Sequence, residues 1–204
     1  MKKIADEQLV VDYLQGDRDA LSFLVERYLR QIYNFTARYI GNTKEAEDLT
    51  QEIFLKVWKS LKKFNSQKSF KTWLFSIARN VCIDYLRRKK IVTFSDLEND
   101  NDDESFSDKI ADESISVIEK ITRQELEREM GKYLLRLSEA NRSVLILHYS
   151  QQMAFREISE MLGESLDTVK SRHRRALNYL RRFIEQEGKM HQKQAVKRIY
   201  NHKD

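Results

Sequence analysis

Residues 155–175 read FREISEMLGESLDTVKSRHRR, a pattern typical of two helices joined by a tight turn. Gly163 stands where such a turn needs a glycine, and Ser165 is a good N-cap for the second helix. Ser159, four residues before the glycine, is small enough for a close helix crossing, and Val169, six residues after it, is a β-branched core anchor. The segment therefore predicts a helix-turn-helix.

The second helix of this motif is strongly basic, with six lysines and arginines and no acidic residue from Lys170 to Arg182. A helix in the major groove of DNA needs cations for phosphates and forked donors for guanine edges. The alternative is a solvated basic face on an ordinary helical hairpin. We expect bases to be read by Asp167, Thr168, Ser171, Arg172 and Arg175, and phosphates to be bound by Lys170 and Arg174.

The composition of the whole chain points to an all-α protein. It has 204 residues with no proline and only five glycines, whereas a sheet-rich domain would use more of both in its turns. The net charge is +5, which permits an anionic partner without requiring one.

The charge is distributed unevenly along the chain. Residues 95–119 hold ten acidic residues and one basic residue, so this segment carries −9 and the rest of the chain +14. We expect residues 95–117 to form a flexible acidic linker between two helical domains, residues 1–94 and residues 118–187. Residues 188–204 form a basic tail whose fold the sequence does not predict.

Turn signals divide the N-terminal half into helices. Gly16 and Asp17 separate two apolar helical patterns, and Gly41 is a plausible C-cap for the second. Asn42 with Glu45 makes a capping-box pattern for the next helix. The apolar stripe predicted for that helix consists of Ile53, Phe54, Val57, Trp58 and Leu61. The polar loop 65–69 follows, and then a helix over residues 70–90 with a buried stripe of Leu74, Ile77, Ala78, Val81 and Leu86.

Several classes of function are disfavoured. The four histidines have no carboxylate or cysteine partner at the spacing of metal ligands, and no glycine-rich loop could cradle a phosphate. Cys82 lies among apolar residues in a predicted helix and is more typical of packing than of a nucleophile. We expect no enzyme activity, no cofactor and no metal. No apolar run approaches a membrane span and the N-terminus lacks a signal peptide's apolar core, so the chain is expected in the cytoplasm without membrane insertion.

Two stretches taken together resemble one known family. Residues 45–90, EAEDLTQEIFLKVWKSLKKFNSQKSFKTWLFSIARNVCIDYLRRKK, resemble domain two of the extracytoplasmic-function (ECF) sigma factors of the sigma-70 superfamily. Residues 156–182, REISEMLGESLDTVKSRHRRALNYLRR, resemble their domain four. The resemblance covers residues 6–187, and the acidic linker stands where the family lacks a domain three.

The resemblance implies an RNA polymerase sigma factor, which binds core RNA polymerase and directs promoter-specific transcription initiation. Domain two would read and open the minus-ten element of promoter DNA, and domain four would read the minus-thirty-five element. The linker would thread toward the catalytic cleft and mimic nucleic acid, or it would be only a solubilising tether. A stand-alone helix-turn-helix regulator with an unrelated sensor domain is the alternative, and it would have no need of the DLTQE motif at residues 48–52.

In the family, the helix with the DLTQE-type motif docks on a coiled coil of the largest polymerase subunit. The residues expected to face outward for this contact are Asp48, Gln51, Glu52, Lys56 and Lys59. A solvated helix face is the alternative.

Strand opening needs a pocket for an unstacked base and a basic track for the strand. By resemblance, the loop around residues 64–70 holds the flipped minus-ten base, and Asn80 occupies the position of the family's "ARN" motif. Trp73 is expected in the core, although it could stack on a base. The expected minus-ten set is Phe64, Asn65, Ser66, Gln67, Lys68, Arg79, Asn80, Asp84, Arg87 and Arg88.

The chain departs from the family pattern at two positions. His173 stands where a leucine is common, and its helix face would also hold Val169, Ala176 and Leu180. A neutral, hydrogen-bonded core histidine is expected there, with local loosening or pH sensitivity as the alternative. Ala154 replaces the usual hydroxyl cap of the first motif helix, at a cost of about 1 kcal/mol. ECF relatives are often held inactive by an anti-sigma factor, and no residue here identifies one.

Overall fold

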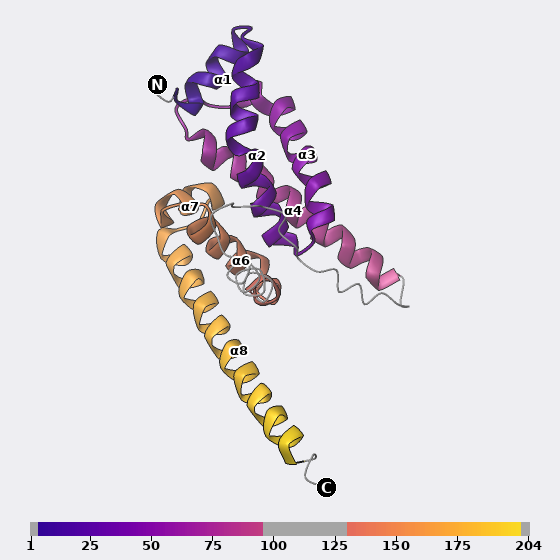
Figure 1. Ribbon diagram of the computed structural model, residues 1–204. Coiled ribbons are helices and arrows are strands. Elements are labelled where there is room, and N and C mark those ends of the chain that lie inside the picture. The colour runs from indigo at the N-terminus through magenta and orange to yellow at the C-terminus, as the bar shows by residue number, and fades with distance from the viewer. Residues whose placement is uncertain (1–3, 96–129, 201–204) are drawn as a thin grey trace, which may run out of the picture.

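The computed structural model describes residues 4–95 and 130–200, and this part of the chain is helical without a strand (Figure 1). The predicted linker, apart from Ser95, and the predicted start of the second domain lie outside the described residues. The N-terminal domain consists of α1 (Asp6–Leu14), α2 (Arg18–Ile40), α3 (Thr43–Ser60), the 3₁₀ turn η1 (Leu61–Lys63) and α4 (Phe70–Ser95). The C-terminal domain consists of helical residues 130–135, α6 (Glu139–Leu145), the π-helical turn η2 (Ile146–Ser150), α7 (Phe155–Leu162) and α8 (Leu166–Tyr200). The prediction of an all-α, two-domain fold is therefore confirmed.

The predicted boundaries around Gly16, Gly41 and Asn42 are confirmed by their caps, whereas α4 runs to Ser95, five residues past its predicted end. The Asp17 side chain accepts a hydrogen bond from the backbone N–H of Asp19 at the start of α2. Gly41 ends α2 in the left-handed region at φ 74°, a conformation that costs a glycine little. The Asn42 side chain then accepts from the N–H of Glu45 at 3.1 Å and begins α3.

The apolar stripe of α3 differs from the prediction most clearly at Trp58, and Phe54 is half-buried. Ile53, Val57 and Leu61 are buried as expected, but Trp58 is 51% exposed. Its indole N–H donates to the Tyr13 hydroxyl of α1 at 2.7 Å, so the ring lies across the domain's surface rather than in the core. Helical periodicity places Trp58 near the stripe, but only the packing of α1 shows that it lies at the edge.

The buried face of α4 is wider than the predicted stripe. Phe75 and Cys82 are fully buried together with Leu74, Val81 and Ala78. Ile77 and Leu86 are only half-buried. The reason is that α4 packs against α2 and α3 and also against α7 of the second domain.

The predicted helix-turn-helix is confirmed. α7 ends at Gly163, which is left-handed at φ 64°, and the Ser165 hydroxyl accepts from the N–H of Thr168 at 3.1 Å to cap α8. Ser159 and Val169 are buried at the helix crossing, as their spacing predicts. Ala154 provides no side-chain cap to α7, but the Glu157 carboxylate accepts from the Ala154 N–H at 2.7 Å.

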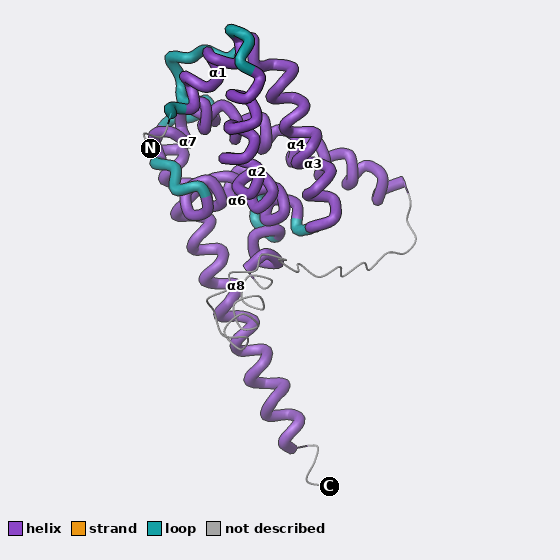
Figure 2. Tube along the Cα trace, turned by 45° about the horizontal axis from the view of Figure 1, so that its top comes forward, coloured by secondary structure: helices purple, strands orange, loops and turns teal. Residues whose placement is uncertain are grey.

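Helix α8 continues well past the helix-turn-helix and extends away from the remainder of the protein (Figures 1 and 2). It runs without a break through Gly188 to Tyr200, so most of the basic tail is helical. An interior glycine costs about 1 kcal/mol, and strong helix formers such as Glu185 and Gln186 precede it.

The two domains pack directly on one another through buried polar contacts. The Tyr39 hydroxyl of α2 lies 2.8 Å from the Ser143 hydroxyl of α6, and both residues are fully buried. The buried Arg142 guanidinium donates to the Tyr39 carbonyl at 2.8 Å and to the carbonyls of residues 134, 135 and 137 in its own domain. Apolar residues of both domains accordingly belong to one core. In this arrangement the minus-ten and minus-thirty-five candidates belong to one compact unit.

Within residues 4–95 and 130–200, no helix is both long and apolar enough to cross a membrane.

Candidate nucleic-acid interface

The first turns of α8 present the residues expected to contact the minus-thirty-five element. Asp167, Lys170, Arg174 and Arg175 are exposed, whereas Thr168, Ser171 and Arg172 are half-buried. All seven lie in the first three turns of one helix, the part of a recognition helix that contacts base edges.

Arg172 is held in place by an ion pair across the turn. Its guanidinium lies 2.8 Å from Oε1 of Glu164, and the two side chains are 22% and 26% exposed. The other carboxylate oxygen of Glu164 is buried without a partner among the described residues. Arg172 is therefore oriented before any ligand arrives, and a base would have to compete with Glu164 for it. The sequence showed the cation but not its partner, because Glu164 precedes α8 and lies eight positions before Arg172, outside the spacing of ion pairs within one helix.

His173 lies in an aromatic cluster between α8 and η2. Its Nε2 lies 3.0 Å from the Tyr149 hydroxyl, and its ring contacts those of His148 and Phe155. Burial, and secondarily the nearby His148, lower the pKa of His173 below its usual value. The expected hydrogen-bonded histidine is found and its lowered pKa favours the neutral form, although the side chain is half-buried rather than in the core.

The loop before α4, residues 65–69, is a compact turn that adjoins a cluster of aromatic side chains. The side-chain oxygen of Asn65 accepts a hydrogen bond from the backbone N–H of Gln67 at 2.9 Å. The backbone carbonyl of Asn65 accepts one from the N–H of Lys68, also at 2.9 Å. Phe64 packs beneath this loop, with its ring 5.6 Å from that of Phe70 and 5.1 Å from that of Trp73. Half-buried Phe64 and the side-chain oxygen of Asn65 thus shape the loop, and all of residues 65–69 are exposed.

A pocket of about 570 Å³ opens beside this loop. Its walls include a cation, hydroxyls, an amide and the half-buried Trp73 ring, which suits it to an unstacked base. Two of its residues come from α7 of the other domain. The lining residues are Gln67, Lys68, Ser69, Thr72, Trp73, Ser76, Glu160 and Met161.

Along α4, the minus-ten candidates differ in accessibility. Asn80, Asp84, Arg87 and Arg88 are exposed. Arg79 is half-buried, and its Nε donates to the Ser143 hydroxyl of the C-terminal domain at 3.0 Å. In this arrangement Arg79 therefore holds the two domains together instead of facing solvent.

The outward face of α3 carries the residues expected to dock on the polymerase. Asp48, Gln51, Lys56 and Lys59 are exposed, and half-buried Glu52 pairs with Lys56 at 2.9 Å. Glu52 also lies 4.0 Å from Arg88, so the docking candidates adjoin the minus-ten candidates.

Two apolar side chains on this face were missed by sequence reasoning. Leu55 is 52% exposed and Trp58 is 51% exposed. The signal for Leu55 was present, because it falls outside the helix's apolar stripe, next to the polar docking candidates.

The structure offers little for chemistry of other kinds. Complete burial raises the pKa of the Cys82 thiol to about 12, so this cysteine is a poor nucleophile. Among the described residues no group of three or more histidine, cysteine or acidic side chains could hold a metal ion.

Comparisons with known proteins agree with the two-part division of the chain. Residues 24–91 match the family model of Sigma-70 region 2, and residues 133–182 match that of Sigma-70, region 4. The ECF RNA polymerase sigma factor SigW of Bacillus subtilis is 32% identical over 82% of this chain and 90% of its own. The RNA polymerase sigma-H factor of Pseudomonas aeruginosa is 31% identical over 84% of this chain and 89% of its own.

Solved structures show the same fold. The sigma factor RpoE of Bartonella quintana, solved in complex with the anti-sigma factor NepR, has a TM-score of 0.63 at 25% identity, with 80% of this chain and 96% of that chain covered. CnrH, solved with the cytosolic domain of CnrY, has a TM-score of 0.67 at 22% identity, with 89% and 98% covered.

Proposed function

The chain belongs to the ECF RNA polymerase sigma factors of the sigma-70 family, and on that premise we propose how its residues divide promoter recognition. As a sigma factor it binds core RNA polymerase and directs promoter-specific transcription initiation. It acts by binding rather than by catalysis, and it acts in the cytoplasm, where its polymerase is.

The observation that carries the residue assignments is the pairing of a helix-turn-helix with a loop pocket in one chain. The N-terminal turns of α8 enter the major groove of the minus-thirty-five element. There Lys170 and Arg174 bind phosphates, while Arg172 and Arg175 bring forked donors to base edges. Glu164 releases Arg172 to a base and otherwise keeps it oriented at 2.8 Å.

The wall of the pocket that the N-terminal domain supplies, from loop 65–69 to Trp73 and Ser76, receives the flipped base of the minus-ten element once α7 has moved away. Stacking of one base on an aromatic ring contributes roughly 1–3 kcal/mol, and Trp73 offers such a ring in the pocket wall. Asn80, exposed in α4, presents a donor and an acceptor to a neighbouring base, and Arg87 and Arg88 follow the strand.

The outward face of α3 docks on the coiled coil of the polymerase. Its charged residues set orientation and association rate, because exposed ion pairs contribute little affinity alone. Leu55 and Trp58 supply the apolar contact at the centre of this surface, since both are half-exposed beside the charged residues.

Promoter binding requires the two domains to move apart. The two promoter elements lie about 25 base pairs apart, which is roughly 85 Å at 3.4 Å per pair. In the structure, residues of loop 65–69 and of α7 line the same pocket, and Arg79 is bonded to Ser143. Binding to core polymerase must therefore favour a separated state over the packed one.

We also propose that an anti-sigma factor regulates the chain. The Bartonella quintana sigma factor was solved with such a partner, and the packed domains here offer a state that a partner could stabilise.

The experiment that tests this function measures binding to a labelled promoter fragment with and without core polymerase. The free chain should bind duplex DNA weakly and without preference, whereas the complex should bind it specifically. Specific operator binding by the free chain, unchanged by polymerase, would instead identify a stand-alone helix-turn-helix regulator.

A further inference from the structure

Helix α1 lies outside the segment that matches Sigma-70 region 2, yet it contacts the start of the helix that carries the minus-ten candidates. The Oε1 atom of Glu7 accepts a hydrogen bond from the backbone N–H of Phe70 at 2.8 Å. Phe70 is the first residue of α4 and directly follows loop 65–69. One carboxylate of α1 is therefore bonded to the junction between the loop and α4.

This N–H needs an acceptor from elsewhere in the chain. The first four N–H groups of a helix have no partner within it, and Phe70 is 2% exposed, so water has little access. Ser69, the residue before the helix, accepts hydrogen bonds from two later N–H groups. Its hydroxyl accepts from the N–H of Thr72, and its backbone carbonyl accepts from the N–H of Trp73. Glu7 satisfies the buried N–H of Phe70, and its negative charge suits the positive end of the helix dipole.

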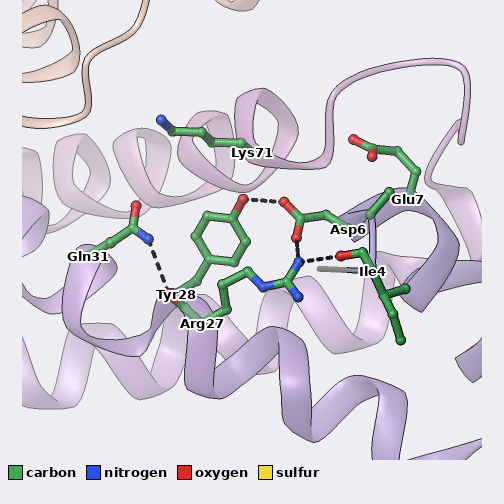
Figure 3. Close-up of a pocket in the computed structure, with 8 residues that line it drawn as sticks. Ile4, Asp6, Glu7, Arg27, Tyr28, Gln31 and Lys71 are labelled. Atoms are coloured by element: carbon green, nitrogen blue, oxygen red, sulfur yellow. Dashed lines mark hydrogen bonds and ion pairs between the residues drawn. The ribbon is translucent and has the colours of Figure 1, made fainter. Parts of the chain in front are cut away.

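Glu7 is itself held by a fixed element. The neighbouring Asp6 carboxylate accepts hydrogen bonds from Arg27 and from the Tyr28 hydroxyl of α2 (Figure 3). Arg27 also donates to the Ile4 carbonyl at 3.0 Å, drawn in the same view. The ring of Tyr28 in turn lies 5.8 Å from that of Phe70. The position of Glu7 is thus set by α2, which also supports the ring at the start of α4.

We propose that Glu7 is a positioning residue for minus-ten recognition, because it fixes the point at which loop 65–69 joins α4. This inference rests on the proposed role of that loop. The loop has five residues, so a displacement of its C-terminal end at Phe70 moves the pocket residues Gln67, Lys68 and Ser69 with it. Glu7 touches no DNA in this account and acts only through the loop.

The test compares three substitutions. Glu7→Ala removes the acceptor, Glu7→Gln keeps an acceptor without the charge, and Glu7→Asp keeps the charge but shortens the reach. Glu26→Ala, an exposed glutamate of α2, is the matched control. With core polymerase, the measured quantities are promoter opening and the preference for the best minus-ten sequence over one with a substituted base.

We expect Glu7→Ala to lower both opening and base preference by up to about tenfold, the factor reached if the whole free energy of a lost capping hydrogen bond is felt at the loop. Glu7→Gln should restore base preference to within about threefold of wild type, whereas Glu7→Asp should not. Affinity for core polymerase should stay constant throughout, and on a template already unpaired at the minus-ten element the opening defect should disappear. If Glu7→Ala does not fold, the comparison of Glu7→Asp with Glu7→Gln decides the question.

Unchanged base preference in Glu7→Ala, or equal loss in the Asp and Gln variants, would overturn the inference. A wild-type protein that shows no minus-ten preference at all would instead refute the proposed function, so the two failures are distinguishable.

Discussion

Replacing Asn80 by alanine should impair promoter opening without weakening the fold. Asn80 is exposed on α4, and its side-chain oxygen receives only a long hydrogen bond, 3.5 Å, from Arg79. No buried contact is lost, and alanine is the better helix former by up to about 0.7 kcal/mol. We therefore expect the free energy of unfolding to stay constant or to rise slightly.

The functional loss should be much larger. A well-formed contact between an asparagine and a base edge contributes about 1–3 kcal/mol of discrimination. Since about 1.4 kcal/mol corresponds to a factor of ten, Asn80→Ala should lower opening of the preferred minus-ten sequence by roughly 5- to 150-fold. Affinity for core polymerase should not change, because the proposed docking residues lie on α3.

The assay is promoter opening followed by the fluorescence of a base analogue in the minus-ten element, with core affinity measured separately. Asn178→Ala is the matched control, since it makes the same change at an exposed position of α8. Equal loss of core binding and opening would refute the assignment of separate surfaces to α3 and α4. Unchanged opening would remove Asn80 from the minus-ten set.

Three further predictions concern the packed state. Arg142→Met should lower the free energy of unfolding by about 3 kcal/mol or more, because it leaves buried carbonyls of both domains without a donor. Urea unfolding measures this loss, with exposed Arg174→Met as the control. A loss below about 1 kcal/mol, equal to that of the control, would contradict the prediction. Burial holds the pKa of His173 below its usual 6.5, so the stability it contributes is present above about pH 6.5 and is lost as the pH falls below that value. The free energy of unfolding, measured at several pH values, should show this loss in wild type and a smaller loss in His173→Leu. Identical pH dependence in the two proteins would contradict the assignment to His173. Cysteines introduced at Gln67 and Glu160 can carry a pair of dyes, because the buried Cys82 stays unlabelled. Energy transfer between the dyes should be efficient in the free chain and should fall when core polymerase binds. Constant transfer would refute domain separation.

Local signals in the sequence predicted most of the helix boundaries. Asp17, Gly41 and Asn42 act through neighbours one to four residues away, and so do the caps around Gly163. Such short-range hydrogen bonds follow from the chemistry of the residues themselves. The helix-turn-helix was therefore predictable in detail.

Contacts between distant residues were not predictable in this way. The Glu7 cap on Phe70 joins residues 63 positions apart, and the Tyr39–Ser143 contact joins residues 104 positions apart. Arg79 was expected to contact DNA from its position on α4, and only the packing of the second domain shows that it also contacts Ser143. Hydrophobic periodicity specifies which face is buried but not what covers it, which is also why the prediction that Trp58 belongs to the apolar stripe of α3 was wrong.

The division of promoter reading between α4 and α8 is tested most directly by transcription in vitro with purified core polymerase on a library of randomised promoters, followed by sequencing of the transcript starts. We expect specific starts that require this chain and share two motifs at a fixed spacing. Substitution of Asn80 should alter only the motif nearer the start, and substitution of Arg172 or Arg175 only the more distant one. Transcripts without specific starts, or starts with a single motif that either substitution alters, would contradict the division of promoter reading between α4 and α8.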